Sequence, residues 1–236
     1  MNEDEYAIGI ITNPIGKAGI TPLTNLIRII NNCSNKIYII TGNDGRITYD
    51  AEKGHIVVSS RNYSTKGNLL NKISNYIMLQ LFVSIEILRR KKDVSTWIFF
   101  LDAHALLLPV IVAKITMKKI IFMPAASIKK AAEVKKSTLY YLLSYSEMLT
   151  NRFASRMILY SNNLISEWNL EKYQHKILTG HEHFLDFNTF TVTTPLPDRP
   201  FLIGYIGRLS EEKGVQHFAQ ALPAILSDQE DLRALI

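Results

Sequence analysis

The sequence predicts an α/β protein: a doubly wound, Rossmann-like parallel sheet followed by the start of a second such unit. Three observations support this prediction. Short runs rich in β-branched residues alternate with helix-like segments along most of the chain. The central residues of these runs form continuous apolar stretches, which is typical of strands covered by helices on both faces. A proline-rich segment, 193–200, then interrupts the pattern before a strand-like run and a helix-like segment begin again.

The first domain is expected to contain a parallel sheet with helices between its strands. The expected strands, in chain order, are 6–12, 36–41, 55–60, 97–101, 118–123, 156–161 and 175–179. The expected helices are 21–32, 68–90, 104–116 and 137–153. Thr21 and Pro22 suit the N-cap and the first position of a helix. Ligands of such sheets bind beyond the carboxyl ends of the strands, which draws attention to the loops 13–20, 42–46, 60–67, 102–105, 124–136 and 161–163.

The proline-rich segment predicts the domain organisation. We expect a first domain over 1–192, a linker over 193–200 and the start of a second domain over 201–236. The strand of this second domain is expected within 201–207 and its helix within 212–228.

Composition and charge exclude several classes of protein. The chain has 236 residues and a single cysteine, Cys33, so it has no internal disulfide framework and fits the cytoplasm. The acidic start, MNEDEY, is unlike a secretory signal peptide. The formal net charge is +6, and its excess lies in four clusters: 89–92, 118–119, 129–130 and 135–136. These clusters are either solvated surface or a site for anionic lipid or a phosphorylated ligand. Nucleic acid is not an expected partner, because no aromatic residues interleave with them.

The segment IGYIGRLSEEKGV, 203–215, contains the clearest candidate binding residues. Arg208 follows the carboxyl end of an expected strand, and Lys213 lies near the start of the next helix. Free backbone N–H groups at a helix start favour an anion, and two cations beside them suit a diphosphate. The alternative is that both are ordinary solvated loop residues.

This segment, extended to GYIGRLSEEKGVQHFAQALPAIL, resembles the start of the C-terminal domain of family 4 glycosyltransferases. These are retaining, nucleotide-sugar-dependent enzymes of the GT-B fold. The resemblance implies that Arg208 and Lys213 contact the donor diphosphate, and that the reaction transfers a hexose from a nucleotide sugar to an acceptor with retention. It implies an acceptor-side first domain, a sugar or lipid-linked acceptor, no cofactor beyond the donor and no bound metal. An anionic surface at the inner face of the membrane is a further possible partner.

The first domain resembles the same family in three places. NPIGKAGITPL is similar to a glycine-rich first loop that packs against donor phosphate, which implies that role for Gly16 and Gly19. His104, after WIFFLD, matches a cleft histidine of the family and is the candidate catalytic residue, with a structural histidine as the alternative. Asp102 either orients His104 or caps a helix.

The third place is LTNRFASRMILYSNNLISEWNLEKYQHKILT, near the end of the first domain. Ser161 and Asn162 follow a strand in a stretch similar to the end of the family's first domain, and could touch ligand. The His-x-His pattern of GHEHF, with Asp186 near, is better explained as a connector than as a metal site. No glycine fingerprint for a dinucleotide or for a Walker A loop follows the first strand.

The chain departs from the family pattern at its end. The family's acidic pair, seven residues apart, would lie beyond Ile236, where the second strand of the C-terminal domain should begin. We therefore expect an incomplete form that is inactive alone. Two alternatives remain: a non-catalytic fragment that binds acceptor or membrane, and another nucleotide-using α/β enzyme such as a sugar-nucleotide oxidoreductase.

Overall fold

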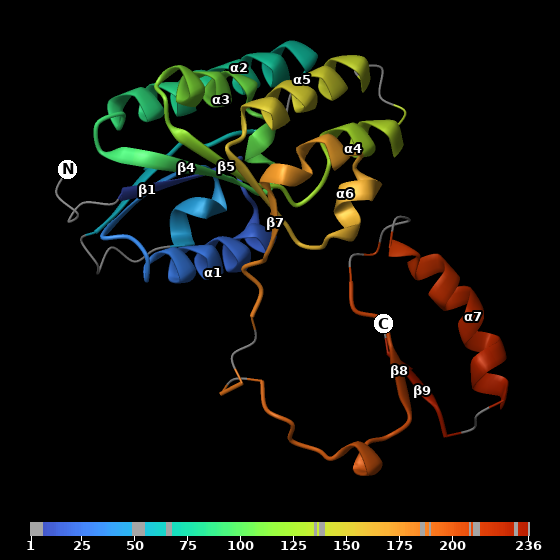
Figure 1. Cartoon of the computed structure of the whole chain (residues 1–236). Coiled ribbons are helices and arrows are strands. Elements are labelled where there is room, and N and C mark those ends of the chain that lie inside the picture. Colours follow the sequence, from blue (N-terminus) through green and yellow to red (C-terminus); the bar gives the residue numbers. More distant parts are fainter. Residues whose placement is uncertain are drawn as a thin grey trace. The chain divides into compact units, whose positions relative to one another are not determined.

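The computed structural model (Figure 1) describes residues 7–48, 55–64, 68–134, 136, 140–184, 187–188, 190–207, 209, 213–228 and 231–235. The chain forms two compact units, Met1–Phe184 and Leu185–Ile236. The segment 193–200, predicted as the linker, lies within the second unit.

The first unit is built on a parallel sheet of seven strands in the order β3-β2-β1-β4-β5-β6-β7. The strands are β1 Ala7–Thr12, β2 Lys36–Thr41, β3 Ile56–Ser60, β4 Val94–Phe100, β5 Lys119–Met123, β6 Arg156–Leu159 and β7 Ile177–Thr179. The predicted doubly wound parallel sheet is therefore confirmed.

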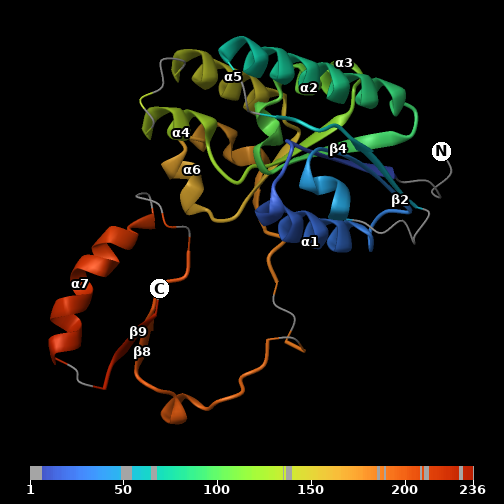
Figure 2. The same cartoon turned by 180° about the vertical axis from the view of Figure 1, so that it is seen from behind.

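Helices cover both faces of this sheet. They are α1 Ile20–Ile30, α2 Leu69–Arg89, α3 Leu107–Ile115, α4 Ile128–Val134, α5 Tyr140–Phe153 and α6 Asn163–Glu167. Figures 1 and 2 show α2, α3 and α5 on one face and α1 on the other. Short 3-10 helices are η1 Lys17–Gly19, η2 Asp44–Thr48, η3 Leu101–Ala105 and η4 Glu171–Lys176.

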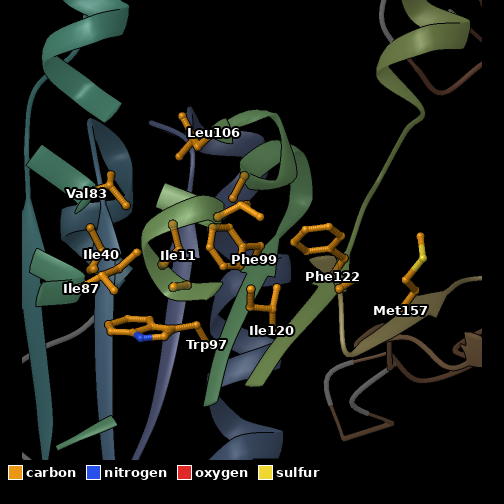
Figure 3. Packing of buried hydrophobic residues seen from close by; sticks show 14 of the residues in the cluster. Ile11, Ile40, Val83, Ile87, Trp97, Phe99, Leu106, Ile120, Phe122 and Met157 are labelled. Carbon is orange, nitrogen blue, oxygen red and sulfur yellow. The ribbon is translucent and has the colours of Figure 1, made fainter. Parts of the chain in front are cut away.

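The two faces of the sheet form two hydrophobic clusters, because successive side chains of a strand point to opposite sides. In β4, Trp97 and Phe99 belong to the cluster under α2 and α3, while Ile98 and Phe100 belong to the cluster over α1. Figure 3 shows Trp97 and Phe99 packed among residues of the first cluster. Trp97 lies opposite Gly9 in the β1–β4 register, and a Cβ on Gly9 would come within 2.1 Å of the indole ring.

Strand β4 begins at Val94, three residues before the expected start at 97. The segment Val94-Ser95-Thr96 looks loop-like in sequence because two of its residues are polar. However, Val94 and Thr96 are both buried, and only Ser95 is exposed. The pairing with β1, which shifts register between Ala7 and Ile8, draws the segment into the sheet.

The expected helix 104–116 is divided in two. It starts as η3, breaks at Leu106 and continues as α3. Pro109 is the third residue of α3, a position whose N–H needs no partner within the helix. Helix α4 was not expected from its sequence pattern.

The second unit contains a parallel pair of short strands, β8 Leu202–Gly204 and β9 Arg233–Leu235, together with η5 Leu196–Asp198. Helix α7, Val215–Asp228, connects the two strands. This is a βαβ arrangement, as a second Rossmann-like unit requires at its start. In neither unit does the described chain contain a helix with the length and hydropathy to cross a membrane.

Candidate functional site at the sheet switch point

The strand order reverses direction between β1 and β4. From β1 the chain builds β2 and β3 on one side, then returns to add β4 on the other side. The loops after β1 and β4 therefore diverge at the carboxyl edge, and this is where open α/β sheets bind ligands. A pocket of about 340 Å³ lies at this place, lined by Asn13, Pro14, Asn43, Tyr63, Leu79 and Asp102.

Hydrogen bonds hold the loops around this pocket. The Asn13 side-chain amide donates to the Asp102 carbonyl at 2.9 Å, joining the loops after β1 and β4. The Asn43 side-chain oxygen accepts from the Tyr63 backbone N–H at 2.8 Å. Ile15 exchanges backbone hydrogen bonds with Gly42 and Asp44 across the loops after β1 and β2. The pocket thus presents amide groups, an exposed carboxylate and an aromatic ring, which are groups that suit a hydroxyl-rich ligand.

Gly16 and Gly19 have different surroundings in the loop after β1. Gly16 is exposed, and a Cβ added there would meet no atom within 4 Å among the described residues. At Gly19 an added Cβ would lie 2.9 Å from the Ile15 Cβ. Packing therefore explains a glycine at 19, and no such contact explains one at 16.

Asp102 and His104 both belong to η3, but their side chains have different surroundings. Asp102 is exposed and lines the switch-point pocket. His104 is only 2% exposed. Its ring centroid lies 6.2 Å from that of Phe122, and it lines a cavity of about 10 Å³ together with Glu147.

Burial keeps the His104 imidazole neutral at neutral pH. Desolvation lowers its pKa, and the Glu147 and Asp102 carboxylates oppose this shift only in part. Nδ1 lies 3.2 Å from the Leu101 carbonyl. Because a carbonyl can only accept, the proton of the neutral ring belongs on Nδ1, which leaves Nε2 as an acceptor.

Glu147 is a buried carboxylate that the sequence analysis did not identify. It lies on α5, and it accepts hydrogen bonds from the Ser127 hydroxyl at 2.9 Å and from the Lys129 N–H at 2.5 Å. It therefore joins α5 to the start of α4 and also faces His104. A single glutamate in a helix that is otherwise half polar gives no signal of this role in sequence.

Ser161 and Asn162 follow β6, as expected, but neither lines the switch-point pocket. The Ser161 hydroxyl accepts from the Asn163 N–H at 3.2 Å. The Asn162 side-chain oxygen accepts from the Thr179 hydroxyl at the end of β7. Both side chains thus make local bonds at the ends of β6 and β7.

Tyr160 and Glu182 form a second polar contact that sequence did not indicate. The Tyr160 hydroxyl donates to Glu182 Oε1 at 3.1 Å. Burial and then the Glu182 carboxylate raise the pKa of Tyr160 well above its usual value. Within the described part of the chain, Glu182 Oε2 is buried and has no hydrogen-bond partner.

The His-x-His pattern adjoins Glu182. The rings of His181 and His183 stack with centroids 6.1 Å apart. Among the residues that the structure describes, no three His, Cys, Asp or Glu side chains are arranged to hold a metal ion. Asp186 lies outside the described residues.

The predicted diphosphate contacts lie in the second unit. Arg208 is outside the described residues. Lys213 is exposed and is followed by Gly214, whose φ of +68° is in the left-handed region that favours glycine. Helix α7 begins directly afterwards, so Lys213 lies beside its first N–H groups.

Comparison with known proteins adds evidence on the fold. No protein-family model and no curated protein sequence matches the chain. The crystal structure of LpCGTa in complex with UDP matches 98% of this chain and 70% of its own, with a TM-score of 0.61 and 9% identity. Anabaena HepE in complex with UDP and glucose matches 96% of this chain with a TM-score of 0.60 and 18% identity. A UDP-N-acetylglucosamine 2-epimerase matches 98% with a TM-score of 0.59 and 9% identity.

This chain spans 60% of the length of the HepE chain and 63% of that of the epimerase. At sequence identities of 9% and 18%, the similarity to these structures shows a shared fold and nothing more. The chain therefore has the Rossmann-like, GT-B-like α/β fold that these glycosyltransferases and UDP-sugar epimerases share.

Proposed function

We propose that this chain is part of a nucleotide-sugar-dependent glycosyltransferase of the family 4 type, which transfers a hexose to a sugar or lipid-linked acceptor with retention. The observation that carries the proposal is the pocket at the β1–β4 switch point. Its exposed Asp102 carboxylate and its Asn13 and Asn43 amides suit a polyhydroxylated ligand. The chain's low cysteine content favours the cytoplasm as its location.

In this proposal the second unit binds the donor. Arg208 and Lys213 contact the diphosphate, and the start of α7 adds its free N–H groups. These positive groups stabilise the negative charge that develops on the leaving diphosphate. The resemblance also assigns Gly16 and Gly19 to contact with donor phosphate, and no described atom lies within 4 Å of a Cβ added at Gly16.

Within the first unit, His104 is the proposed catalytic residue, although it lines a small cavity beside Glu147 and not the switch-point pocket. Its neutral ring is held by the Leu101 carbonyl and lies beside Glu147, two residues from Asp102. The likeness to UDP-N-acetylglucosamine 2-epimerase favours a second candidate, in which the same crevice epimerises the sugar of the donor.

Ligand binding and product analysis test these alternatives. We expect calorimetry to detect binding of UDP, UDP-glucose or GDP-mannose and no binding of NAD⁺. In a version of the chain extended by a family-type C-terminal remainder, a transferase releases the nucleoside diphosphate only when an acceptor is present, whereas an epimerase converts the sugar nucleotide without one. Binding of NAD⁺ in place of the sugar nucleotides would show that the proposal is wrong.

Substitutions in the second unit test the donor contacts. Arg208→Ala and Lys213→Ala should each weaken binding of UDP-glucose by about ten- to hundredfold, because hydrogen bonds to charged groups contribute about 1.5–3 kcal/mol. Lys172→Ala, an exposed lysine of the first unit, is the matched control. Equal affinity of all three variants for UDP-glucose would show that neither Arg208 nor Lys213 contacts the donor.

A further inference from the structure

Helix α2 is apolar on its outward face as well as on its buried face. Leu79, Val83 and Ile87 point into the core and are at most 2% exposed. The exposed side chains at helical spacing on the other side are also apolar. We name them the α2 stripe: Leu70, Ile73, Ile77, Met78, Leu81, Ile85 and Leu88, each 42–74% exposed. A surface helix normally turns polar residues to water, so a stripe along the whole length of a helix indicates a contact surface.

The apolar surface continues onto α3, which packs beside α2 (Figures 1 and 2). Leu108, Ile115 and Met117 are 36%, 73% and 92% exposed. The Lys118 ammonium group donates to the Lys91 carbonyl, so the turn that carries Met117 is tied to the end of α2. The surface is therefore two helices wide and rigidly connected.

One end of this surface is strongly basic. Helix α2 is followed by Arg90, Lys91 and Lys92, and the turn after α3 carries Lys118 and Lys119. Lys91, Lys92 and Lys119 are exposed. Two carboxylates lie near this end. Glu86 is buried and is bound to Arg89 and Ser59, whereas Asp93 is exposed and accepts a hydrogen bond from the Tyr38 hydroxyl. The sequence contains no Asp or Glu between Glu52 and Glu86, so α2 carries no acidic residue before Glu86.

This charge pattern argues against pairing of two copies through the stripe. A parallel pair would bring two basic ends together. An antiparallel pair would place each basic end against the first turn of the partner's α2, which has no acidic residue and carries the positive end of the helix dipole. An anionic surface avoids both conflicts.

We propose that the α2 stripe, together with Leu108, Ile115 and Met117, docks on an anionic lipid bilayer. The apolar side chains enter the interface between headgroups and acyl chains, and the basic end contacts the negative headgroups. A bilayer adapts to a broad two-helix face and needs no shaped groove. The proposal does not depend on the function proposed for the pocket.

The basic end of the surface and the candidate site lie at opposite edges of the sheet. Helices α2 and α3 end just before β4 and β5 begin, so their basic ends lie at the amino edge of the sheet. The switch-point pocket lies at the carboxyl edge.

Vesicle flotation with the whole chain tests the proposal. We expect binding to vesicles of phosphatidylcholine mixed with phosphatidylglycerol, much weaker binding to phosphatidylcholine alone, and loss of binding as salt increases. Lys91→Gln combined with Lys92→Gln should lower the partition coefficient by about fivefold per residue. Lys129→Gln combined with Lys130→Gln, which removes the same charge at α4, is the matched control and should change binding little.

A second pair of variants tests the apolar contact. Ile77→Ser with Leu81→Ser should lower the partition coefficient at least tenfold and leave the melting temperature nearly unchanged, because both side chains are half exposed. Leu196→Ser with Phe201→Ser, at exposed positions of the second unit, is the control.

Three results would overturn the proposal. The first is equal binding to both kinds of vesicle. The second is loss of binding in the α4 variant and not in the α2 variants. The third is no vesicle binding together with a dimer, or a complex with an acidic peptide, that the Ile77 and Leu81 substitutions abolish.

Discussion

At the scale of single residues, His104 shows how burial decides chemistry. Its neighbour Asp102 lies in the open pocket, while His104 is enclosed beside Glu147 and Phe122. A histidine after a strand is a reasonable catalytic candidate, but its burial depends on how α5 packs over it. The sequence around His104 does not contain that information.

The lowered pKa of His104 predicts a pH dependence of stability. Below about pH 6.5 the unfolded chain binds a proton at this residue that the folded chain excludes, so the free energy of unfolding falls as the pH falls. The loss can reach about 1.4 kcal/mol per pH unit until the folded-state pKa is reached.

Urea denaturation at pH values from about 7.5 to about 5.5 measures this effect, because that range spans the ordinary histidine pKa of about 6.5 in the unfolded chain. The variant His104→Gln should show a shallower decline, because glutamine does not titrate. His175→Gln, at an exposed histidine on η4, is the matched control and should keep the wild-type slope. If the free energy of unfolding depends on pH equally in all three proteins, the pKa of His104 does not differ between the folded and the unfolded state.

At the scale of elements, α4 depends on a contact distant in sequence. It is a short helix, and its first turn is held by the Glu147 carboxylate of α5 through Ser127 and Lys129. Local pattern did not predict α4, because a helix of this length is stable only when other groups satisfy its free N–H donors.

Removing the charge of Glu147 should therefore loosen α4. Glu147→Gln is expected to lower the free energy of unfolding by about 1–3 kcal/mol, since buried hydrogen bonds to a carboxylate are weakened. Hydrogen exchange of the α4 amides should accelerate. Glu133→Gln, which affects the exposed ion pair with Lys130 on the same helix, should change stability by less than about 1 kcal/mol. A similar loss in both variants would contradict a specific role for Glu147.

At the scale of the whole molecule, the first unit contains both hydrophobic clusters and the complete sheet. In the described part of the second unit the secondary structure is a pair of short strands, α7 and η5, and many apolar side chains such as Ile206 and Phe201 are exposed. The two units should differ strongly in their independent stability, because small units bury little apolar surface.

Residues 1–184 expressed alone should therefore fold. We expect a cooperative thermal transition within a few degrees of that of the first unit in the whole chain, measured by near-UV circular dichroism, which reports Trp97 and Trp168 in the core. Residues 185–236 alone should show no cooperative transition. A non-cooperative transition for 1–184 would show that its sheet needs residues of the second unit.

The sequence by itself determined the fold class and the position of nearly every strand. The run 37–40 is apolar without interruption, and burial on both faces of a parallel sheet requires this pattern. It also pointed to the loops after β1 and β4, because the carboxyl edge of such a sheet is known from topology alone. Asn13, Pro14 and Asp102 of these loops line the pocket, together with residues that follow β2 and β3 and with Leu79 of α2.

Tertiary structure decided which side chains meet. The start of β4 at Val94 follows from pairing with β1, the separation of Asp102 from His104 follows from the turn of η3, and the Glu147 contacts join residues about 20 positions apart. The sequence predicted a helix over 68–90, which contains α2. Periodicity records that residues are apolar, but only the packing of α2 against the sheet shows which of its two apolar faces is left to the solvent.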